Sequence, residues 1–363
     1  MNEIHIFNKS DSNKILYGKF RDIYIPLINN DIICSSLNFY NTYHIKGKFY
    51  KKFIKLAIRL FNSRFFIKEY NYFSIDKRLE EELEKINGYK YCAVCKREDN
   101  VNKDYILQLM DDNGNIIGYG KYPGYDDRNE FVVKEVDNLN YINTLGIKCA
   151  RIPRVLLFNE DKEIYIQSTE DNLKNDNGKL SIKHIDFLSE LYHKTKVTYK
   201  FKDSIIYKKL SSIREKTNDE ELIDLSNRIL KEIGLEEVEY CYSHGDFYPP
   251  NIKLNKNFIF VYDWECGRLN TLYFDIFHYI VNEDIVANIK NKELIIDNIL
   301  IDNKYLNEFE SKNNIKNSIR IEMFILYLYE EIYDFIINMG IDKNNDDLVK
   351  NYIEILNMAL ERN

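Results

Sequence analysis

Three side chains in the stretch from Tyr242 to Ile280 have the types and spacing to do chemistry on a phosphate group. Asp246 and Asn251 are separated by four residues, and Asp263 ends a short apolar strand. A carboxylate such as Asp246 can orient an acceptor hydroxyl and accept its proton. Amide and carboxylate oxygens, such as those of Asn251 and Asp263, are ligands that Mg²⁺ prefers. The stretch therefore predicts a base and a magnesium site for phosphoryl transfer.

Phosphoryl transfer also needs a cation on the nucleotide phosphates, and Lys121 has the position for it. Asn113-Gly114 predicts a tight hairpin that joins strands at 105–110 and 116–122. The alternation of a strand places Lys121 on one face with Ile117 and Tyr119. A strand-end lysine that reaches out to water is the alternative interpretation.

Glu135 is the expected partner of that lysine. It lies within the apolar stripe of a helix predicted from Asp126 or Asp127 to Leu145. A buried carboxylate in such a stripe needs a cationic partner, and Lys121 is the natural candidate. Two alternatives stay open, namely that Glu135 lies at the edge of the stripe and that Glu130 is the partner.

The motifs around these residues resemble those of one enzyme family. His244–Ile252 (HGDFYPPNI) resembles the H-G-D-x-x-x-x-N loop of the aminoglycoside phosphotransferase and choline kinase family. Val261–Glu265 (VYDWE) resembles its magnesium-binding segment, and Phe274–Tyr279 (FDIFHY) resembles the helix start that follows. The pattern is most similar to bacterial members associated with surface-polysaccharide synthesis. The resemblance covers roughly residues 105 to 281.

The resemblance implies a role for each matching residue. Asp246 would be the catalytic base, and Asn251 and Asp263 would hold Mg²⁺. Lys121, paired with Glu135, would bind the α and β phosphates of ATP or GTP. The nucleotide base would meet backbone groups near Gln167, Ser168 and Thr169, at the inter-lobe linker that the polar segment 168–179 predicts. His244 would brace the catalytic loop, and Asp275 would anchor it through hydrogen bonds.

The fold implied by the resemblance is α+β and bilobal, protein kinase-like, with a small antiparallel-sheet N-lobe and a mostly helical C-lobe. We expect three parts. Residues 1–88 are an N-terminal extension packed on the N-lobe, 89–168 are the nucleotide-binding N-lobe, and 169–363 are the C-lobe. The C-lobe contains the catalytic loop 243–252 and the metal segment 261–265. Periodicity predicts helices in it at 181–195, 203–215, 219–233, 319–339 and 346–360.

Two departures from kinase motifs narrow the function. The polar segment KREDNVNK after the strand near 89–94 contains no glycine, and no A-P-E motif follows, which disfavours a protein kinase. Pro250 precedes Asn251, where the narrower group often has a bulky aromatic residue, so contacts with the acceptor can differ there. We therefore expect an ATP- and Mg²⁺-dependent phosphotransferase acting on a hydroxyl of a sugar, amino alcohol or aminoglycoside-like molecule.

Alternative functions stay open. The chain could be a catalytically silent nucleotide-binding or scaffold protein, or a peripheral membrane enzyme acting on a lipid-linked sugar. Acids at Glu322, Glu330, Glu331 and Asp334 could hold a cationic acceptor, although a solvated helix face is the favoured interpretation.

Composition limits the partners and the compartment. A net charge of −7 over 363 residues argues against a nucleic-acid partner. Six cysteines do not form a disulfide framework, and Cys92-x-x-Cys95 lacks a second pair, so ordinary thiols are expected. We find no apolar run typical of a leader or a membrane span and expect the cytoplasm. No feature indicates an oligomeric state.

The segment 46–68 is strongly basic, although the whole chain has a net negative charge. It contains eight Lys or Arg and no acid, with charged and apolar residues at helical spacing. An ordinary helix with a solvated basic face is the favoured interpretation. Contact with an anionic membrane surface, at the inner face, is the alternative.

Overall fold

The computed structural model divides the chain into two compact units. Unit 1 comprises residues 1–143 and 153–172, and unit 2 comprises 144–152 and 173–363. The residues that the structure describes are 6–8, 15–39, 45–60, 69–96, 105–122, 129–162, 164–282, 286, 288, 291–300, 303–343 and 345–363. The segment without glycine between the strands near residues 94 and 105 lies mostly outside them.

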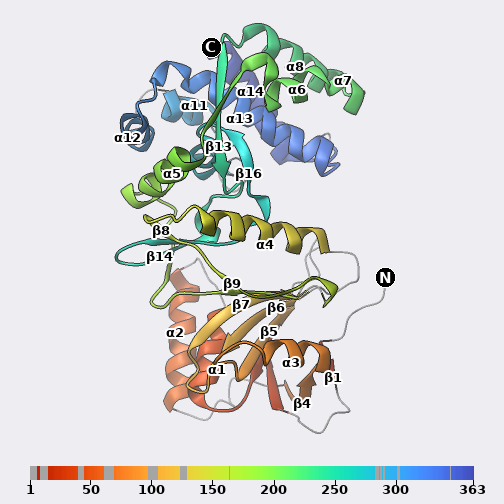
Figure 1. Cartoon of the computed structure of the whole chain (residues 1–363), viewed down its shortest axis with the longest axis vertical. Coiled ribbons are helices and arrows are strands. Elements are labelled where there is room, and N and C mark those ends of the chain that lie inside the picture. Colours follow the sequence, from red (N-terminus) through yellow and green to blue (C-terminus); the bar gives the residue numbers. More distant parts are fainter. Residues whose placement is uncertain are drawn as a thin grey trace. The chain divides into compact units, whose positions relative to one another are not determined.

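Unit 1 is organised on an antiparallel sheet (Figure 1). Among the described residues the sheet has nine strands in the order β1-β4-β2-β3-β5-β6-β7-β10-β9. The strands are β1 (Phe7–Asn8), β2 (Ile15–Phe20), β3 (Ile23–Pro26), β4 (Glu69–Ile75), β5 (Tyr91–Lys96), β6 (Tyr105–Met110), β7 (Ile116–Tyr122), β9 (Val155–Asn159) and β10 (Ile164–Ser168). The first four strands continue the sheet beyond β5, so residues before 88 share the sheet of unit 1 in addition to packing on it.

The β6–β7 hairpin has the predicted strands and turn. Gly114 has φ +80° and donates its N–H to the carbonyl of Asp111 at 3.1 Å, as a turn with positive φ requires. Gly120 faces β10, where a Cβ would lie 2.6 Å from the carbonyl oxygen of Tyr165. The glycine thus permits close packing on one face of β7, while Lys121 lies on the other.

Four helices of unit 1 have bounds that the structure describes: α1 (Asn30–Ser36), α2 (Ile45–Leu60), α3 (Lys77–Leu83) and α4 (Asn129–Thr144). Helix α3 buries Leu79 and Leu83 in a cluster that includes Cys92 of β5. Cys95, three residues along the same strand, packs against a different cluster. Because residues three apart on a strand point to opposite faces, this pair does not form a common site.

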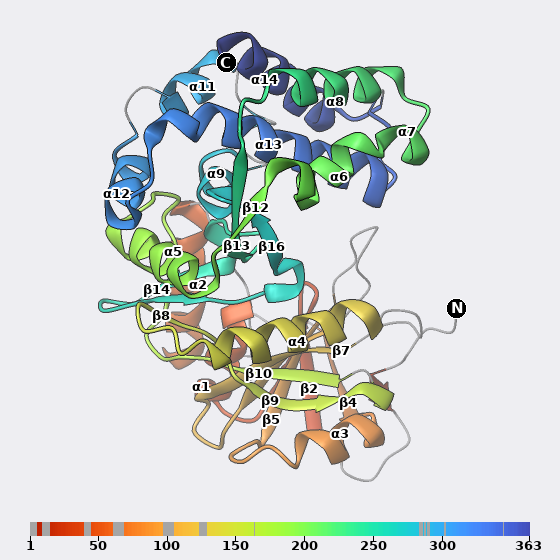
Figure 2. The same ribbon diagram turned by 45° about the horizontal axis from the view of Figure 1, so that its top comes forward.

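Unit 2 is mostly helical (Figure 2). Its described helices are α5 (Ile182–Thr195), α6 (Ile205–Ser211), α7 (Ile213–Lys216), α8 (Glu220–Glu232), α9 (Phe274–Ile280), α11 (Glu293–Leu300), α12 (Lys304–Asn313), α13 (Arg320–Tyr333) and α14 (Asp347–Arg362). The helix predicted at 203–215 is broken at Ser212 into α6 and α7. The helix predicted at 319–339 continues past Tyr333 as a π-helical turn, Asp334–Asn338.

Two small sheets accompany these helices. One has the order β11-β14-β15-β8, with β11 (Lys174–Asn175), β14 (Ile252–Leu254), β15 (Ile259–Val261) and β8 (Ala150–Arg151). The other has the order β12-β13-β16, with β12 (Val197–Lys200), β13 (Glu237–Ser243) and β16 (Arg268–Thr271). Strands β13 and β16 of the second sheet flank the stretch that carries Asp246 and Asp263, and the β14–β15 hairpin of the first sheet lies within that stretch.

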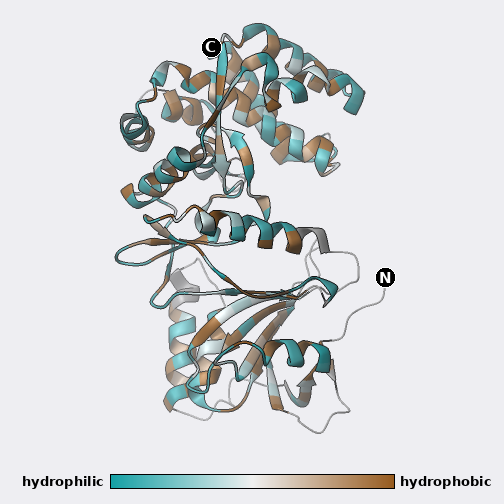
Figure 3. Cartoon of the chain, in the orientation of Figure 1, coloured by the Kyte–Doolittle hydropathy of each residue, from teal (hydrophilic) through white to brown (hydrophobic). Residues whose placement is uncertain are grey.

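Helix α13 forms the centre of the helical packing in unit 2. All of its residues from Met323 to Tyr333 are buried, and Figure 3 shows that the helices of unit 2 carry both hydrophobic and hydrophilic residues. A helix buried on every side must be enclosed by other elements, and its buried charged residues must find partners there. In the described part of the chain, no helix has both the length and the hydropathy needed to cross a bilayer.

Candidate active site

The β14–β15 hairpin brings the two predicted metal ligands to one end of unit 2's small sheet. Ile252 pairs with Val261 at that end, and the N–H of Tyr262 bonds the carbonyl of Asn251 at 3.2 Å. Asn251 therefore enters the hairpin where Asp263 leaves it. The antiparallel pairing explains how residues twelve positions apart emerge together.

The loop that leads from β13 to Asp246 is held by Asp275 at the start of α9. The backbone N–H groups of His244 and Gly245 donate to the two carboxylate oxygens of Asp275 at 2.8 and 3.0 Å. Gly245 has φ +79°, and a Cβ there would collide with the carbonyl oxygen of Cys266. Burial raises the pKa of Asp275, while the two backbone bonds act against that rise. The predicted anchoring by Asp275 is confirmed.

His244 links this loop to the metal segment. Its Nδ1 accepts from the N–H of Asp246 at 3.3 Å, and its Nε2 lies 2.9 Å from the carbonyl oxygen of Tyr262. These partners assign the neutral tautomer with the proton on Nε2. The buried ring also packs on Trp264 with centroids 4.6 Å apart. The predicted bracing function of His244 is confirmed.

Asp246 presents an oriented carboxylate at the surface of unit 2. Its side chain is 38% exposed. Asn251 Nδ2 donates to Asp246 Oδ2 at 2.7 Å and to its backbone carbonyl at 3.0 Å. Because the amide nitrogen holds Asp246, the amide oxygen of Asn251 is the atom suited to a cation.

The backbone of Asp263 has an uncommon conformation for a residue other than glycine. Its φ of +70° is left-handed, a conformation uncommon outside glycine and associated with functional sites. Carboxylate oxygens of Asp263 and Glu265 lie within 4.8 Å of each other. The sequence interpretation did not name Glu265, although the Asp-Trp-Glu motif contains it. Amide and carboxylate oxygens fit Mg²⁺ by their chemistry.

In unit 1, the predicted pairing of Lys121 with Glu135 is confirmed as a contact. Lys121 Nζ on β7 lies 2.8 Å from Glu135 Oε2 on α4, and the Glu135 side chain is fully buried. Val132, Leu139 and Ile142 are buried on the same helix, so Glu135 does lie in the apolar stripe. The side chain of Glu130 and the expected helix cap at Asp126 or Asp127 lie outside the described residues. Phosphate binding by Lys121 stays a prediction.

Comparisons with known proteins identify the fold. No family model matches the sequence, and no curated protein matches it either. The structure matches that of an aminoglycoside 2'-phosphotransferase-IIIa in complex with GDP, with a TM-score of 0.50 and 12% identity over 78% of this chain and 98% of that chain. The chain has the protein kinase-like fold of this aminoglycoside phosphotransferase.

Two further solved structures are similar. Choline kinase LicA from Streptococcus pneumoniae is 11% identical, with a TM-score of 0.49 and coverage of 79% of this chain and 99% of that chain. The ternary complex of streptomycin, ATP and aminoglycoside phosphotransferase APH(2")-IIa is 19% identical, with a TM-score of 0.49 and coverage of 79% and 98%. None of these three structures bears on surface-polysaccharide synthesis, so that part of the resemblance stays a prediction.

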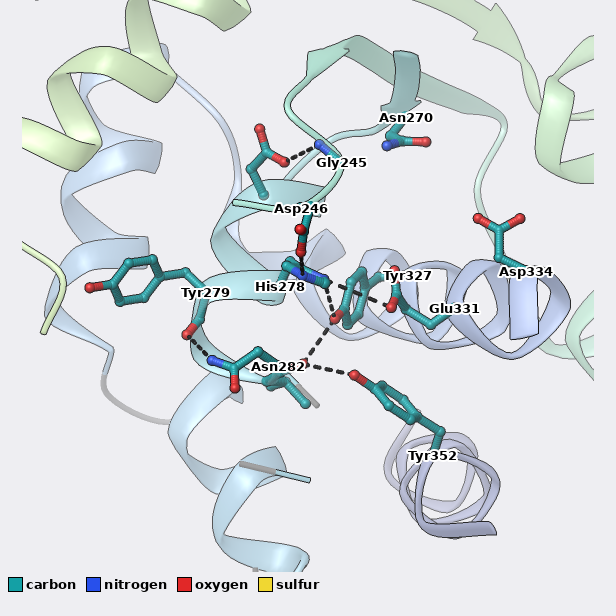
Figure 4. A network of polar contacts seen from close by, with 12 residues as sticks. Gly245, Asp246, Asn270, His278, Tyr279, Asn282, Tyr327, Glu331, Asp334 and Tyr352 are labelled. Carbon is teal, nitrogen blue, oxygen red and sulfur yellow. Dashed lines mark hydrogen bonds and ion pairs between the residues drawn. The ribbon is translucent and has the colours of Figure 1, made fainter. Parts of the chain in front are cut away.

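The sequence interpretation assigned no role to His278, although the Phe274–Tyr279 motif contains it. In the structure its Nε2 lies 3.2 Å from Asp246 Oδ1, and its Nδ1 lies 3.8 Å from Glu331 Oε2 on α13 (Figure 4). The hydroxyl of Tyr327 lies 3.5 Å from the same Nδ1. The imidazole thus connects the carboxylate of Asp246 to a second, buried carboxylate.

These contacts set the protonation of His278. Burial lowers its pKa, whereas the hydrogen bond with Asp246 and the charge of Glu331 raise it. The nearby carboxylate of Asp275 acts in the same direction, and the pKa rises from 6.5 to about 9. The imidazolium form is therefore favoured at neutral pH, with Nε2 3.2 Å from Asp246 Oδ1.

We expect a pH dependence of stability from His278. A pKa raised on folding contributes stability that is complete below pH 6.5 and is lost as pH rises through about 9. The shift corresponds to a contribution on the order of 3 kcal/mol. Urea unfolding of His278→Gln across this range should show a flatter pH profile than the unchanged protein. The exposed His193, replaced by glutamine, is the control, and an equal slope for His278→Gln and the unchanged protein would contradict the assignment.

The acids near the C-terminal end of α13 do not form the solvated face that we expected. Glu330 is buried, lies 3.4 Å from Lys209 Nζ and accepts from Thr271 Oγ1 at 3.0 Å. Asp334 forms an ion pair with Arg268. That interpretation is wrong because cations from distant elements cover these acids. Their charges are already neutralised within unit 2.

The three residues proposed for the nucleotide base lie at the end of β10. Gln167 is in the sheet, paired with Tyr119 of β7 and Val155 of β9. The N–H of Ser168 donates to the carbonyl of Arg154 at 2.8 Å. Thr169 follows the strand, shortly before the chain leaves unit 1 after Asn172. Of the three, Thr169 is thus the one placed beyond the sheet.

Proposed function

We propose that this protein is a phosphotransferase that moves the γ-phosphate of ATP or GTP, with Mg²⁺, to a hydroxyl of a small molecule. The observation that carries the proposal is the carboxylate of Asp246, exposed to solvent and oriented by Asn251 and His278. A catalytic base must be accessible to the acceptor, and its carboxylate must be held in a fixed orientation to accept the hydroxyl proton.

The proposed reaction follows from this geometry. Asp246 accepts the proton of the acceptor hydroxyl, whose oxygen forms a bond to the γ-phosphorus. The bond from that phosphorus to the β–γ bridging oxygen breaks, and the nucleoside diphosphate leaves with the bond's electron pair. Asn251 and Asp263, with Glu265 beside them, would hold Mg²⁺, which neutralises charge on the phosphates.

Within unit 1, Lys121 would bind the α and β phosphates and Glu135 would hold its ammonium group in position. The nucleotide base would meet the backbone near Gln167 to Thr169. The aminoglycoside 2'-phosphotransferase-IIIa structure contains GDP, and the streptomycin complex contains ATP, which supports a nucleotide donor without separating ATP from GTP. A donor of this kind supports action in the cytoplasm.

The proposed acceptor is a small molecule with a hydroxyl group, such as a sugar, an amino alcohol or an aminoglycoside. Aminoglycoside phosphotransferases and a choline kinase share the fold, and each of these substrate classes has a hydroxyl. Glu330 pairs with Lys209, and Asp334 pairs with Arg268. These ion pairs support an acceptor whose binding does not depend on the two acids.

The first experiment uses the purified full chain without a known acceptor. Water can replace the acceptor hydroxyl, so we expect slow Mg²⁺-dependent release of phosphate from ATP or GTP and faster turnover with hydroxyl compounds that bind beside Asp246. Nucleotide with Mg²⁺ should also raise Tm. The second candidate, a silent nucleotide-binding protein, is favoured by the absence of glycine between β5 and β6. A raised Tm without any transfer would support that candidate. The absence of both a raised Tm and transfer would contradict both candidates.

A further inference from the structure

Helix α2, which lies in unit 1 (Figure 1), has a stripe of exposed apolar side chains along one face. Phe49, Phe53, Leu56 and Leu60 are 69, 62, 56 and 67% exposed. Their spacing of four, three and four residues places them on one face of a helix. Tyr50 is 50% exposed beside them. An exposed face of this size needs an explanation, since isolated apolar residues are the usual case.

The stripe is not a consequence of a poorly packed helix. On the opposite side of α2, Ile54 and Ile58 are buried in a cluster with Ile25 and Ile33. The orientation of α2 on unit 1 is therefore determined by its packing. Of the fifteen large apolar side chains that are exposed in the described part of the chain, five lie on this helix and the others are scattered.

Basic side chains border the stripe on one side. Lys52 and Arg59 are exposed, and by helical spacing both lie next to Leu56. Lys51 and Lys55 instead contact Asn38, whose carbonyl and side-chain oxygens they reach at 3.3 and 2.6 Å. The sequence from 46 to 68 contains no acid. The outward face of α2 thus combines apolar side chains with positive charge.

The apolar side chains and the positive charge together indicate what kind of partner binds this face of α2. A second copy of the same helix would bring like charges together, which opposes association. An anionic bilayer offers an apolar boundary and negative phosphates in the same surface, and each basic residue near it contributes favourably. We propose that α2 is an interfacial helix that docks this protein on an anionic lipid surface. Phe49, Phe53, Leu56 and Leu60 enter the boundary between headgroups and acyl chains.

The inference goes beyond the proposed function and can be tested separately from it. The full chain should sediment with vesicles of equal parts phosphatidylglycerol and phosphatidylcholine, but not with vesicles of phosphatidylcholine alone. Phe53→Ser with Leu56→Ser should weaken binding to the phosphatidylglycerol vesicles at least about tenfold. Lys52→Glu with Arg59→Glu should weaken it as well, because the attraction to anionic headgroups is lost. Leu294→Ser with Tyr72→Ser, at exposed apolar positions outside α2, is the matched control. Asp246→Ala should still bind vesicles.

The outcomes decide the proposal. Binding to anionic vesicles that falls with salt and with the α2 variants, but not with the control pair, supports it. Equal binding to both vesicle types, or binding that the α2 variants do not change, overturns it. Failure to bind vesicles also overturns it, and a dimer that Phe53→Ser with Leu56→Ser dissociates would assign the face to a second copy. We expect each variant to fold, because the substituted side chains are exposed. Thermal unfolding of each variant checks this.

Discussion

Asp246→Ala is expected to lower phosphoryl transfer by at least about a thousandfold, within the range for loss of a general base. The variant removes the only group we assign to accept the hydroxyl proton. It leaves the loop anchored by Asp275 and braced by His244, whose contacts involve the backbone at 244–246. The side chain of Asp246 is partly exposed, so its loss should not create an enclosed cavity.

The measurement pairs turnover with nucleotide binding. Phosphate transfer from ATP or GTP is followed together with the rise in Tm caused by nucleotide and Mg²⁺. Asp246→Ala should lose the transfer and keep a rise in Tm, because Asn251, Asp263 and Lys121 are unchanged. The control is Asp224→Ala, an exposed acid on α8, which should behave like the unchanged protein. Full turnover by Asp246→Ala would refute the proposed base.

The parts of the fold that the sequence predicted are those determined by neighbours along the chain. The β6–β7 hairpin depends on one Asn-Gly turn and two alternating strands, and its bounds agree with those predicted. The pairing of Lys121 with Glu135 depends on the same hairpin and on one helix stripe. In both cases the deciding residues lie within about thirty positions, where periodicity alone sets the direction of a side chain.

The parts that could not be predicted depend on long-range contacts. Strand β4 pairs with β2 across some fifty residues, and no local pattern specifies that partner. His278 lies at an ordinary helical position, and only the fold brings it to Asp246. Glu330 looks like a surface acid in the sequence and is buried because Lys209 and Thr271 reach it from other elements. Burial of a polar residue is a property of the assembly and not of its own helix.

Lys121→Met is expected to destabilise unit 1 and to remove nucleotide binding. The substitution takes the ammonium group away from Glu135, which is fully buried. Removing one partner of a buried ion pair typically costs about 3–5 kcal/mol. Urea unfolding should show this loss in the transition of unit 1, and the rise in Tm on addition of nucleotide and Mg²⁺ should disappear.

The double variant Lys121→Met with Glu135→Leu separates the structural contribution of the pair from its proposed function. Replacing both charges with apolar side chains of similar size removes the uncompensated carboxylate, so stability should return to within about 1–2 kcal/mol of the unchanged protein. Nucleotide binding should not return, because methionine carries no charge to meet the phosphates. A stable double variant that still binds nucleotide and transfers phosphate would show that Lys121 only supports the packing of α4 on β7. A stable double variant that does neither would assign the ammonium group to the nucleotide phosphates, since the loss could then not be attributed to unfolding.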